Sequence, residues 1–205
     1  MPILGPLHKK HGENRHDFVG FIDDHPIQIE SVQTINKTYA TWLIKGAGLF
    51  AHREHFKNVG YFDDRFFLNW DDSDWCLRAS KAGYSLLMVR DAVIHHVGSA
   101  SMGGSRSPVQ AYFMARNLLL FGKKHFSIAQ RVRQLHLLAW QARELSRPTS
   151  DRLWLADILV ADSGSCAAFR RGVIDYFLGR FGDCPAIIRK WNENASKLGI
   201  CNHIP

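Results

Sequence analysis

Residues 67–84 read FLNWDDSDWCLRASKAGY and combine an acidic start with a helical spacing of aromatic and small residues. Three carboxylates lie between two tryptophans in this stretch: Trp70, Asp71, Asp72, Asp74 and Trp75. Trp75, Ala79 and Ala82 recur at helical spacing before Gly83. This pattern predicts a helix over 71–82 that ends at the glycine.

Two roles are open for the acidic cluster at the start of this helix. A first-turn carboxylate can cap the helix by accepting hydrogen bonds from free backbone N–H groups and by complementing the helix dipole. One cap needs only one carboxylate, and this segment offers three. A carboxylate that faces a partly dry pocket can instead act as a general base, because hydrogen bonds fix its direction and desolvation raises its basicity.

Short apolar runs on both sides of the helix predict a sheet. They cover Phe18–Ile22, Ile27–Ile35, Trp42–Phe50, 85–90 and 92–97. Gly46 and Gly48 interrupt the third run, and a glycine inside a strand marks a bulge or a close approach of another group, such as a sugar. We expect a short helix over Arg53–Val59 and a loop over 1–16. Strands alternating with helices predict an α/β or α+β sheet.

From Pro108 onward the pattern is helical. A first helix is expected over 111–125, and a second from Phe126 to Leu145. The second carries an apolar stripe of Ile128, Val132, Leu135, Ala139 and Ala142. We expect this stripe to pack on the body of the protein. The alternative is a basic amphipathic helix lying on an anionic membrane surface. Two further helices are expected within 151–181, followed by a loose tail.

The composition restricts the classes of partner and compartment. Lys and Arg number 26 against 19 Asp and Glu in 205 residues, and the stretch 106–147 contains a single acid, Glu144. Such a basic stretch favours phosphate-rich partners, but no nucleic-acid-binding motif is present. The four cysteines form no CxxC pair, which argues against a zinc ribbon or a disulfide framework. No apolar run approaches the ~18 residues of a membrane span. We therefore expect a cytoplasmic location, with peripheral contact at the inner membrane face as the alternative.

Three segments, in this order, resemble the second half of family 2 glycosyltransferases with the GT-A fold, nearest to the rhamnosyltransferase-like subgroup. They read GAGLFAHREHFKNVGYFDDRFF, NWDDSDWCLRASKAGYSLLMVRDAVIHHVGSAS and YFMARNLLLFGKKH, and the match runs from Trp42 to His125. The resemblance implies an α/β fold in which a partial GT-A-like mixed sheet, the acceptor-side half, is followed by C-terminal helices. We expect the acceptor-side half over 1–105, the C-terminal helical region over 106–185 and the tail over 186–205.

The resemblance also assigns a role to the acidic cluster. Asp71, Asp72 and Asp74 match the acidic motif of these enzymes, with Asp71 where glutamate is commoner. Asp72 is by resemblance the catalytic base of an inverting transfer, in which an acceptor hydroxyl attacks the anomeric carbon opposite the departing nucleoside diphosphate. Acceptor-binding or positioning roles are expected for Gly46, Trp70, Asp71, Asp74 and Trp75.

Further residues are expected at the donor side. His96 matches a family histidine that helps to hold a divalent metal, Mg²⁺ or Mn²⁺, on the diphosphate. The alternative is a histidine bonded to loop backbone. His95 should point to the other face of the strand. Arg106 and Arg116 are expected to contact the donor diphosphate, because guanidinium groups suit phosphate oxygens. Solvated arginines are the alternative for both.

These expectations define the predicted function. The chain is expected to be an inverting glycosyltransferase of cell-surface polysaccharide synthesis, as a fragment without the N-terminal nucleotide-binding half. It would transfer a sugar, with rhamnose as one candidate, from a nucleotide-sugar donor to a hydroxyl of a glycan or lipid-linked glycan acceptor. The alternatives are a catalytically silent acceptor-binding module, one half of a split enzyme whose partner supplies the missing half, and a metal hydrolase using His96 and the aspartates. No nucleic-acid partner is expected.

Overall fold

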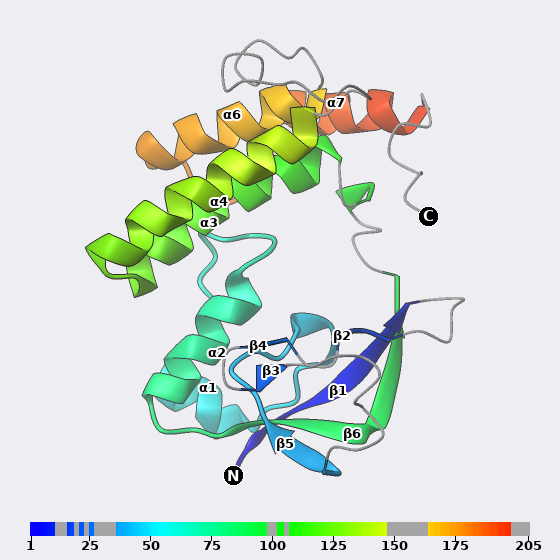
Figure 1. Cartoon of the computed structure of the whole chain (residues 1–205), viewed down its shortest axis with the longest axis vertical. Coiled ribbons are helices and arrows are strands. Elements are labelled where there is room, and N and C mark those ends of the chain that lie inside the picture. Colours follow the sequence, from blue (N-terminus) through cyan, green and yellow to red (C-terminus); the bar gives the residue numbers. More distant parts are fainter. Residues whose placement is uncertain are drawn as a thin grey trace. The chain divides into compact units, whose positions relative to one another are not determined.

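The structure, a computed structural model, describes residues 1–10, 16–18, 21–22, 25–26, 36–97, 102–104, 107–146 and 164–197. The chain divides into two compact units. The first comprises Met1–Asp63 and Asp71–Gly98, and the second comprises Asp64–Trp70 and Ser99–Pro205. The strands lie in the first unit and the long helices in the second (Figure 1).

Four strands among the described residues form a mixed sheet in the order β2-β1-β6-β5. Their bounds are β1 Ile3–Lys10, β2 His16–Phe18, β5 Thr38–Ala40 and β6 Leu86–His96. β1 and β6 run parallel at the centre, and β2 and β5 pair antiparallel at the two edges (Figure 1). β3 (Phe21–Ile22) and β4 (His25–Pro26) form a separate antiparallel pair. The predicted mixed α/β class is confirmed, whereas the expected strand over Ile27–Ile35 lies outside the described residues.

Strand β1 occupies a stretch for which the sequence predicted a loop. Ile3 and Leu7 of β1 are fully buried, so the strand contributes to the core. Gly5 belongs in it because the Ile44 side chain fills the space where a Cβ would lie. The register with β6 shifts between Pro6 and Leu7, and such an irregularity tolerates a residue without an N–H donor. The loop prediction is therefore wrong for Ile3–Lys10.

Strand β6 is continuous, although two separate runs were expected over 85–90 and 92–97. Pairing with β1 passes from Val89 directly to Val93, so the intervening residues bulge out of the ladder. Arg90 and Asp91 lie in this bulge and form an ion pair of 2.9 Å near the surface. The charged residues interrupt the pairing but do not end the strand.

The run Trp42–Phe50 is not the interrupted strand that was expected. It contains a 3₁₀ helix, η2 (Gly46–Gly48), and only an isolated bridge joins Phe50 to Leu4. A Cβ on Gly48 would lie 2.6 Å from Pro6, so this glycine allows a close approach to the protein's own sheet. A Cβ on Gly46 would meet nothing closer than 3.6 Å. The close approach expected in this run therefore occurs at Gly48.

Two helices complete the first unit, and both end as predicted. Helix α1 (Arg53–Val59) is followed by Gly60 at a φ of 87°, and α2 (Asp71–Lys81) by Gly83 at a φ of 86°. Glycine adopts such positive φ values more readily than other residues, which explains why Gly60 and Gly83 follow the ends of these helices.

Helix α2 carries a buried thiol in the core of the first unit. The Cys76 Sγ lies 3.4 Å from the N–H of Ile44 and 3.5 Å from its carbonyl oxygen. Burial raises the pKa of the Cys76 thiol to about 12. This side chain ties α2 to the backbone ahead of η2, and its thiol stays protonated at neutral pH.

The helices described in the second unit are α3 (Pro108–His125), α4 (Ile128–Ser146), α6 (Gly164–Phe177) and α7 (Ala186–Lys197). α3 starts with Ser107 as its cap and packs most extensively against α6. α6 lies within the region where two helices were expected, and 147–163 lies outside the described residues. The tail prediction is wrong for Ala186–Lys197, because Ile188 of α7 is fully buried in the core of the unit. No helix among the described residues is long and apolar enough to cross a membrane.

Helices α3 and α6 approach each other closely at Gly172. A Cβ at this position would collide with the backbone carbonyl oxygen of Tyr112, which cannot move away as a side-chain end could. Gly172→Ala should therefore separate the two helices and lower the free energy of unfolding by about 1–3 kcal/mol. Thermal melting measures the effect.

A matched control lies at the start of the same helix. A Cβ on Gly164 would meet its nearest neighbour at 3.5 Å, which is ordinary van der Waals contact. Gly164→Ala should leave the melting temperature unchanged or raise it slightly, because alanine favours helix. Equal melting temperatures for the two variants would contradict the close helix packing.

Candidate functional site

The carboxylate of Asp72 is held from two directions at the start of α2. Its Oδ2 accepts a hydrogen bond of 3.0 Å from the N–H of Gly46, and its Oδ1 accepts one of 2.7 Å from the N–H of Ser73. The Ser73 hydroxyl donates a longer bond of 3.3 Å to the same Oδ1. Asp72 is half-buried, so part of the carboxylate stays accessible. The structure thus brings together Gly46 and Asp72, two predicted site residues that lie far apart in sequence.

Asp71 directly precedes Asp72 and has the more strained electrostatic environment. Burial raises the pKa of its carboxyl group, and the nearby charges of Asp72 and Asp74 raise it further. The backbone N–H groups of Asp71 and Asp72 lower it in part. The first turn therefore contains one carboxylate fixed by hydrogen bonds and one neighbour with an elevated proton affinity.

Asp74 and Trp75 face the core and anchor the helix. Asp74 is fully buried and its Oδ2 accepts a 2.9 Å bond from Nε of Arg78, one helical turn later. The Arg78 guanidinium also donates bonds of 2.7 Å to the carbonyls of Val59 and Tyr61. Trp75 is fully buried as well, and its indole N–H donates to Gly60 O at 2.8 Å. This geometry supports a positioning role for Asp74 and Trp75 and leaves neither side chain accessible to an acceptor.

The raised pKa of Asp71 leads to a prediction about pH and stability. The folded protein keeps this carboxyl protonated to a higher pH than the unfolded chain, so ionisation of Asp71 costs stability as the pH rises above about 3.8, its ordinary value. Asp71→Asn removes this cost and should raise the melting temperature at neutral pH. The gain should shrink as the pH falls toward 3.8.

The comparison needs a carboxylate outside the cluster. Asp64 is exposed, so Asp64→Asn should shift the melting temperature little at any of these pH values. A destabilised Asp71→Asn variant at neutral pH would contradict the electrostatic strain and would indicate that the Asp71 carboxylate makes a net favourable contact.

The backbone that leads into α2 is strained. Three residues without glycine's freedom adopt left-handed conformations: Phe67 (φ 61°), Asn69 (φ 61°) and Trp70 (φ 68°). The N–H of Leu68 donates to the carbonyl of Phe66 at 2.7 Å, which closes a γ-turn around Phe67 in its strained form. Each such conformation costs on the order of 1–3 kcal/mol for a residue with a side chain. Other contacts must hold this loop.

Asn117 of α3 supplies those contacts. Its side-chain amide donates to the carbonyls of Phe66 (2.7 Å), Leu68 and Asn69 (3.1 Å). The side-chain carbonyl of Asn117 in turn accepts a 3.0 Å bond from Nε of Arg116. Asn117 is fully buried, so these carbonyls find their partner away from water. One side chain therefore fixes most of the strained loop.

Arg116 is fully buried beside it. Its Nη2 donates to the carbonyls of Arg65 (3.1 Å) and Phe66 (3.0 Å), and its Nη1 lies 3.4 Å from the hydroxyl of Tyr112. Burial lowers the pKa of the guanidinium, and contacts with Tyr112 partly offset this. A guanidinium enclosed in this way stabilises the loop and lacks the exposure that a diphosphate contact requires. Arg106, the other predicted diphosphate contact, lies outside the described residues.

The amide of Asn117 can be tested by removal. Asn117→Ala would remove this donor from the carbonyls of Leu68 and Asn69 in a loop that is already strained, while the Phe66 carbonyl keeps its bonds from Arg116 and Leu68. We expect the free energy of unfolding to fall by about 3 kcal/mol or more, measured by denaturant titration. As a control, Asn58 also donates a side-chain bond, of 2.6 Å to Tyr84, but at an exposed site. Asn58→Ala should cost under about 1 kcal/mol. Similar losses for both variants would contradict the special role of Asn117.

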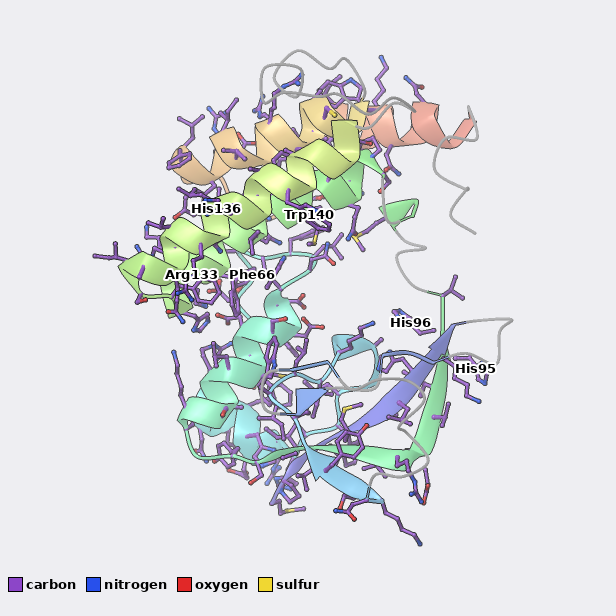
Figure 2. All side chains as sticks on the ribbon, viewed as in Figure 1. Phe66, His95, His96, Arg133, His136 and Trp140 are labelled. Carbon is purple, nitrogen blue, oxygen red and sulfur yellow. The ribbon has the colours of Figure 1, made fainter. Side chains whose placement is uncertain are left out.

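His96 lies at the end of β6, on the face opposite to exposed His95, as the strand periodicity predicts (Figure 2). Its Nδ1 is buried and makes no hydrogen bond among the described residues. The ring of His8, from the neighbouring strand β1, lies 5.6 Å away, edge to face. No three His, Cys, Asp or Glu side chains gather as a metal site within the described ranges. The metal role expected for His96 stays a prediction.

Trp70, the last residue of the strained loop, lines an open cavity in the second unit. The cavity has a volume of about 280 Å³ and is lined by Trp70, Leu118, Phe126, Gln130, Arg133 and Gln134. An indole wall with a guanidinium nearby suits a ligand ring with one apolar face and polar groups at its edge. Trp70 is thus the predicted acceptor residue whose side chain borders such a space.

Asn117 and Arg78 were missed in the sequence analysis, although signals for both existed. Asn117 follows Arg116 inside the apolar run YFMARNLLLF, and a polar pair within a buried helix must find hydrogen-bond partners. Arg78 lies four residues after Asp74, which is the spacing of a helical ion pair.

Comparison with known proteins relates part of this chain to a transferase. Over 97 residues it is 29% identical to the dTDP-rhamnosyl transferase RfbF of Shigella flexneri. The match covers 43% of this chain and 33% of that protein, so the chain spans well under half of this relative's length. Neither a family model nor a solved structure matches the chain. The similarity supports a relationship to glycosyltransferases.

Proposed function

We propose that this chain is the acceptor-side part of an inverting family 2 glycosyltransferase, with Asp72 as its general base. The donor is a nucleotide sugar, with dTDP-rhamnose as the first candidate, and the acceptor is a hydroxyl of a glycan or lipid-linked glycan. The observation that carries the proposal is the orientation of the Asp72 carboxylate by Gly46 and Ser73 at the start of α2. The similarity to a rhamnosyl transferase supports the reaction class.

The carboxylate of Asp72 can accept a proton while it keeps its hydrogen bonds. Its Oδ2 uses one lone pair on the N–H of Gly46 and has a second one available, whereas Oδ1 already accepts two bonds from Ser73. In the transfer, the acceptor hydroxyl oxygen bonds to the anomeric carbon, its proton passes to Asp72, and the bond to the diphosphate breaks with its electron pair on the departing nucleoside diphosphate. Fixing the carboxylate beforehand lowers the entropy cost of this step.

Neighbouring residues support this role of Asp72. The charge of Asp72 raises the pKa of the neighbouring Asp71. His96 would hold the divalent metal through its buried Nδ1, and such a metal neutralises charge developing on the leaving diphosphate.

Substitution of the base tests the proposal directly. Asp72→Asn keeps the shape of the side chain but removes its basicity, so nucleoside diphosphate release should fall by about 10²–10⁴-fold. The assay contains the chain, a nucleotide-binding half that is either fused to it or added as a separate polypeptide, the nucleotide-sugar donor and the acceptor glycan. The exposed Asp64→Asn serves as the matched control and should retain full turnover. Unchanged turnover in Asp72→Asn, or a loss confined to Asp71→Asn, would reject Asp72 as the base.

We propose as a second function an acceptor-binding module or one half of a split enzyme, for which the open cavity beside Trp70 offers a binding surface. Titration of the chain alone separates the two proposals. Glycan binding without nucleotide-sugar binding supports the module. Tight binding of a nucleotide sugar that depends on Mn²⁺ contradicts it.

A further inference from the structure

Helix α4 turns apolar side chains to solvent. Ile128 is 81% exposed, and Val132, Leu135 and Trp140 are each more than half exposed. Ile128, Val132, exposed His136 and Trp140 follow one another at four-residue steps, so they lie in a row along one side of the helix, with Leu135 beside them. We call Ile128, Val132, Leu135 and Trp140 the α4 apolar face. The expected packing of this stripe against the body is wrong for Ile128, Val132 and Leu135.

The side of α4 that is buried carries a polar residue. Gln134 is buried together with Leu138 and Ala142, and its amide donates to the carbonyl of Leu118. The same amide lies against Gly122 of α3, where a Cβ would have no space. Amphipathic helices usually bury their apolar side. α4 therefore has a polar anchor on its packed side and an unpartnered apolar face among the described residues.

Two contacts prevent α4 from rolling over to bury that face. One is the bond from Gln134 to Leu118. The other is the guanidinium of Arg131, which donates to the carbonyls of Lys123 (2.8 Å), Gly122 (3.2 Å) and Phe126 (3.3 Å). These are carbonyls at the C-terminal end of α3, so Arg131 also completes that helix end. Rotation of α4 would break both contacts, and the exposure of the α4 apolar face is thus built into the hairpin of α3 and α4.

The charged side chains that the structure describes on α4 and in the last turn of α3 are all basic. Arg131 and Arg133 lie on α4 and are exposed, and Figure 2 labels Arg133. Exposed Lys123 lies in the last turn of α3. Glu144 is the sole acid in the stretch 106–147. An exposed apolar row that contains a tryptophan and is bordered by arginines is the pattern of a helix that lies in the plane of an anionic lipid surface.

We propose that the α4 apolar face docks on the surface of an anionic bilayer. Ile128, Val132, Leu135 and Trp140 enter the boundary between headgroups and acyl chains, while Arg131 and Arg133 remain at the level of the lipid phosphates. The proposal commits to lipid because the positive charge complements anionic headgroups and the apolar row needs a partner without specific polar groups. It does not depend on the proposed transferase activity.

Vesicle flotation of the full chain tests the proposal. The chain should float with vesicles of phosphatidylcholine mixed with phosphatidylglycerol, and much less with phosphatidylcholine alone or at high salt. The double variant Val132→Ser and Leu135→Ser should bind the mixed vesicles at least about tenfold more weakly, because each loses much of its apolar transfer free energy. Both positions are exposed, so its melting temperature should match that of the parent chain.

Two further variants make the result specific. Arg133→Glu keeps the apolar row and should weaken binding to the anionic vesicles while removing most of its salt dependence. Phe50→Ser removes a side chain that is 72% exposed in the first unit and should leave flotation unchanged. Failure of the parent chain to float, or equal flotation of the Val132 and Leu135 double variant, would overturn the proposal. A dimer that this double variant converts to monomers would overturn it as well, by assigning the face to a second copy of the chain.

Discussion

The hydrogen bonds from Asn117 to the carbonyls of Phe66, Leu68 and Asn69 are the contacts on which the entry into α2 depends. Three side-chain-bearing residues before this helix adopt left-handed backbone conformations, and local sequence preference does not favour them. A buried amide that satisfies several carbonyls at once compensates that strain. Arg116 extends the same network through the Tyr112 hydroxyl to Asp175 of α6.

Placing three carboxylates within four positions is electrostatically costly, and the chain accommodates each in a different way. Asp74 is buried, and its carboxylate forms an ion pair with Arg78 in place of contacts with water. Asp72 is oriented by backbone N–H groups and remains partly accessible. The pKa of Asp71 is raised by burial and by the charges of Asp72 and Asp74. Asp72 is thus the fixed and partly accessible carboxylate of the three, and it is the one that we propose as the general base.

Sequence reasoning succeeded where a local signal coincides with the global structure. Gly60 and Gly83 end their helices because both adopt positive φ values, which a reader of the sequence can anticipate. It failed for β1, because the meaning of Gly5 depends on Ile44, a residue brought close only by folding. Arg116 shows why site residues are harder to predict. The sequence places this arginine on a helix but does not show whether its guanidinium will contact water or backbone carbonyls. Tertiary contacts of this kind have no signature in spacing alone.

The burial of the thiols has a practical consequence for studying the two compact units. Cys76 lies in the core of the first unit, and Cys166 and Cys184 are buried in the second. A thiol without access to solvent reacts slowly with alkylating reagents, so each of these cysteines is modified only when its own unit opens. Peptide mapping after timed alkylation can thus report the opening of each unit separately, from one unmodified sample and without any introduced probe.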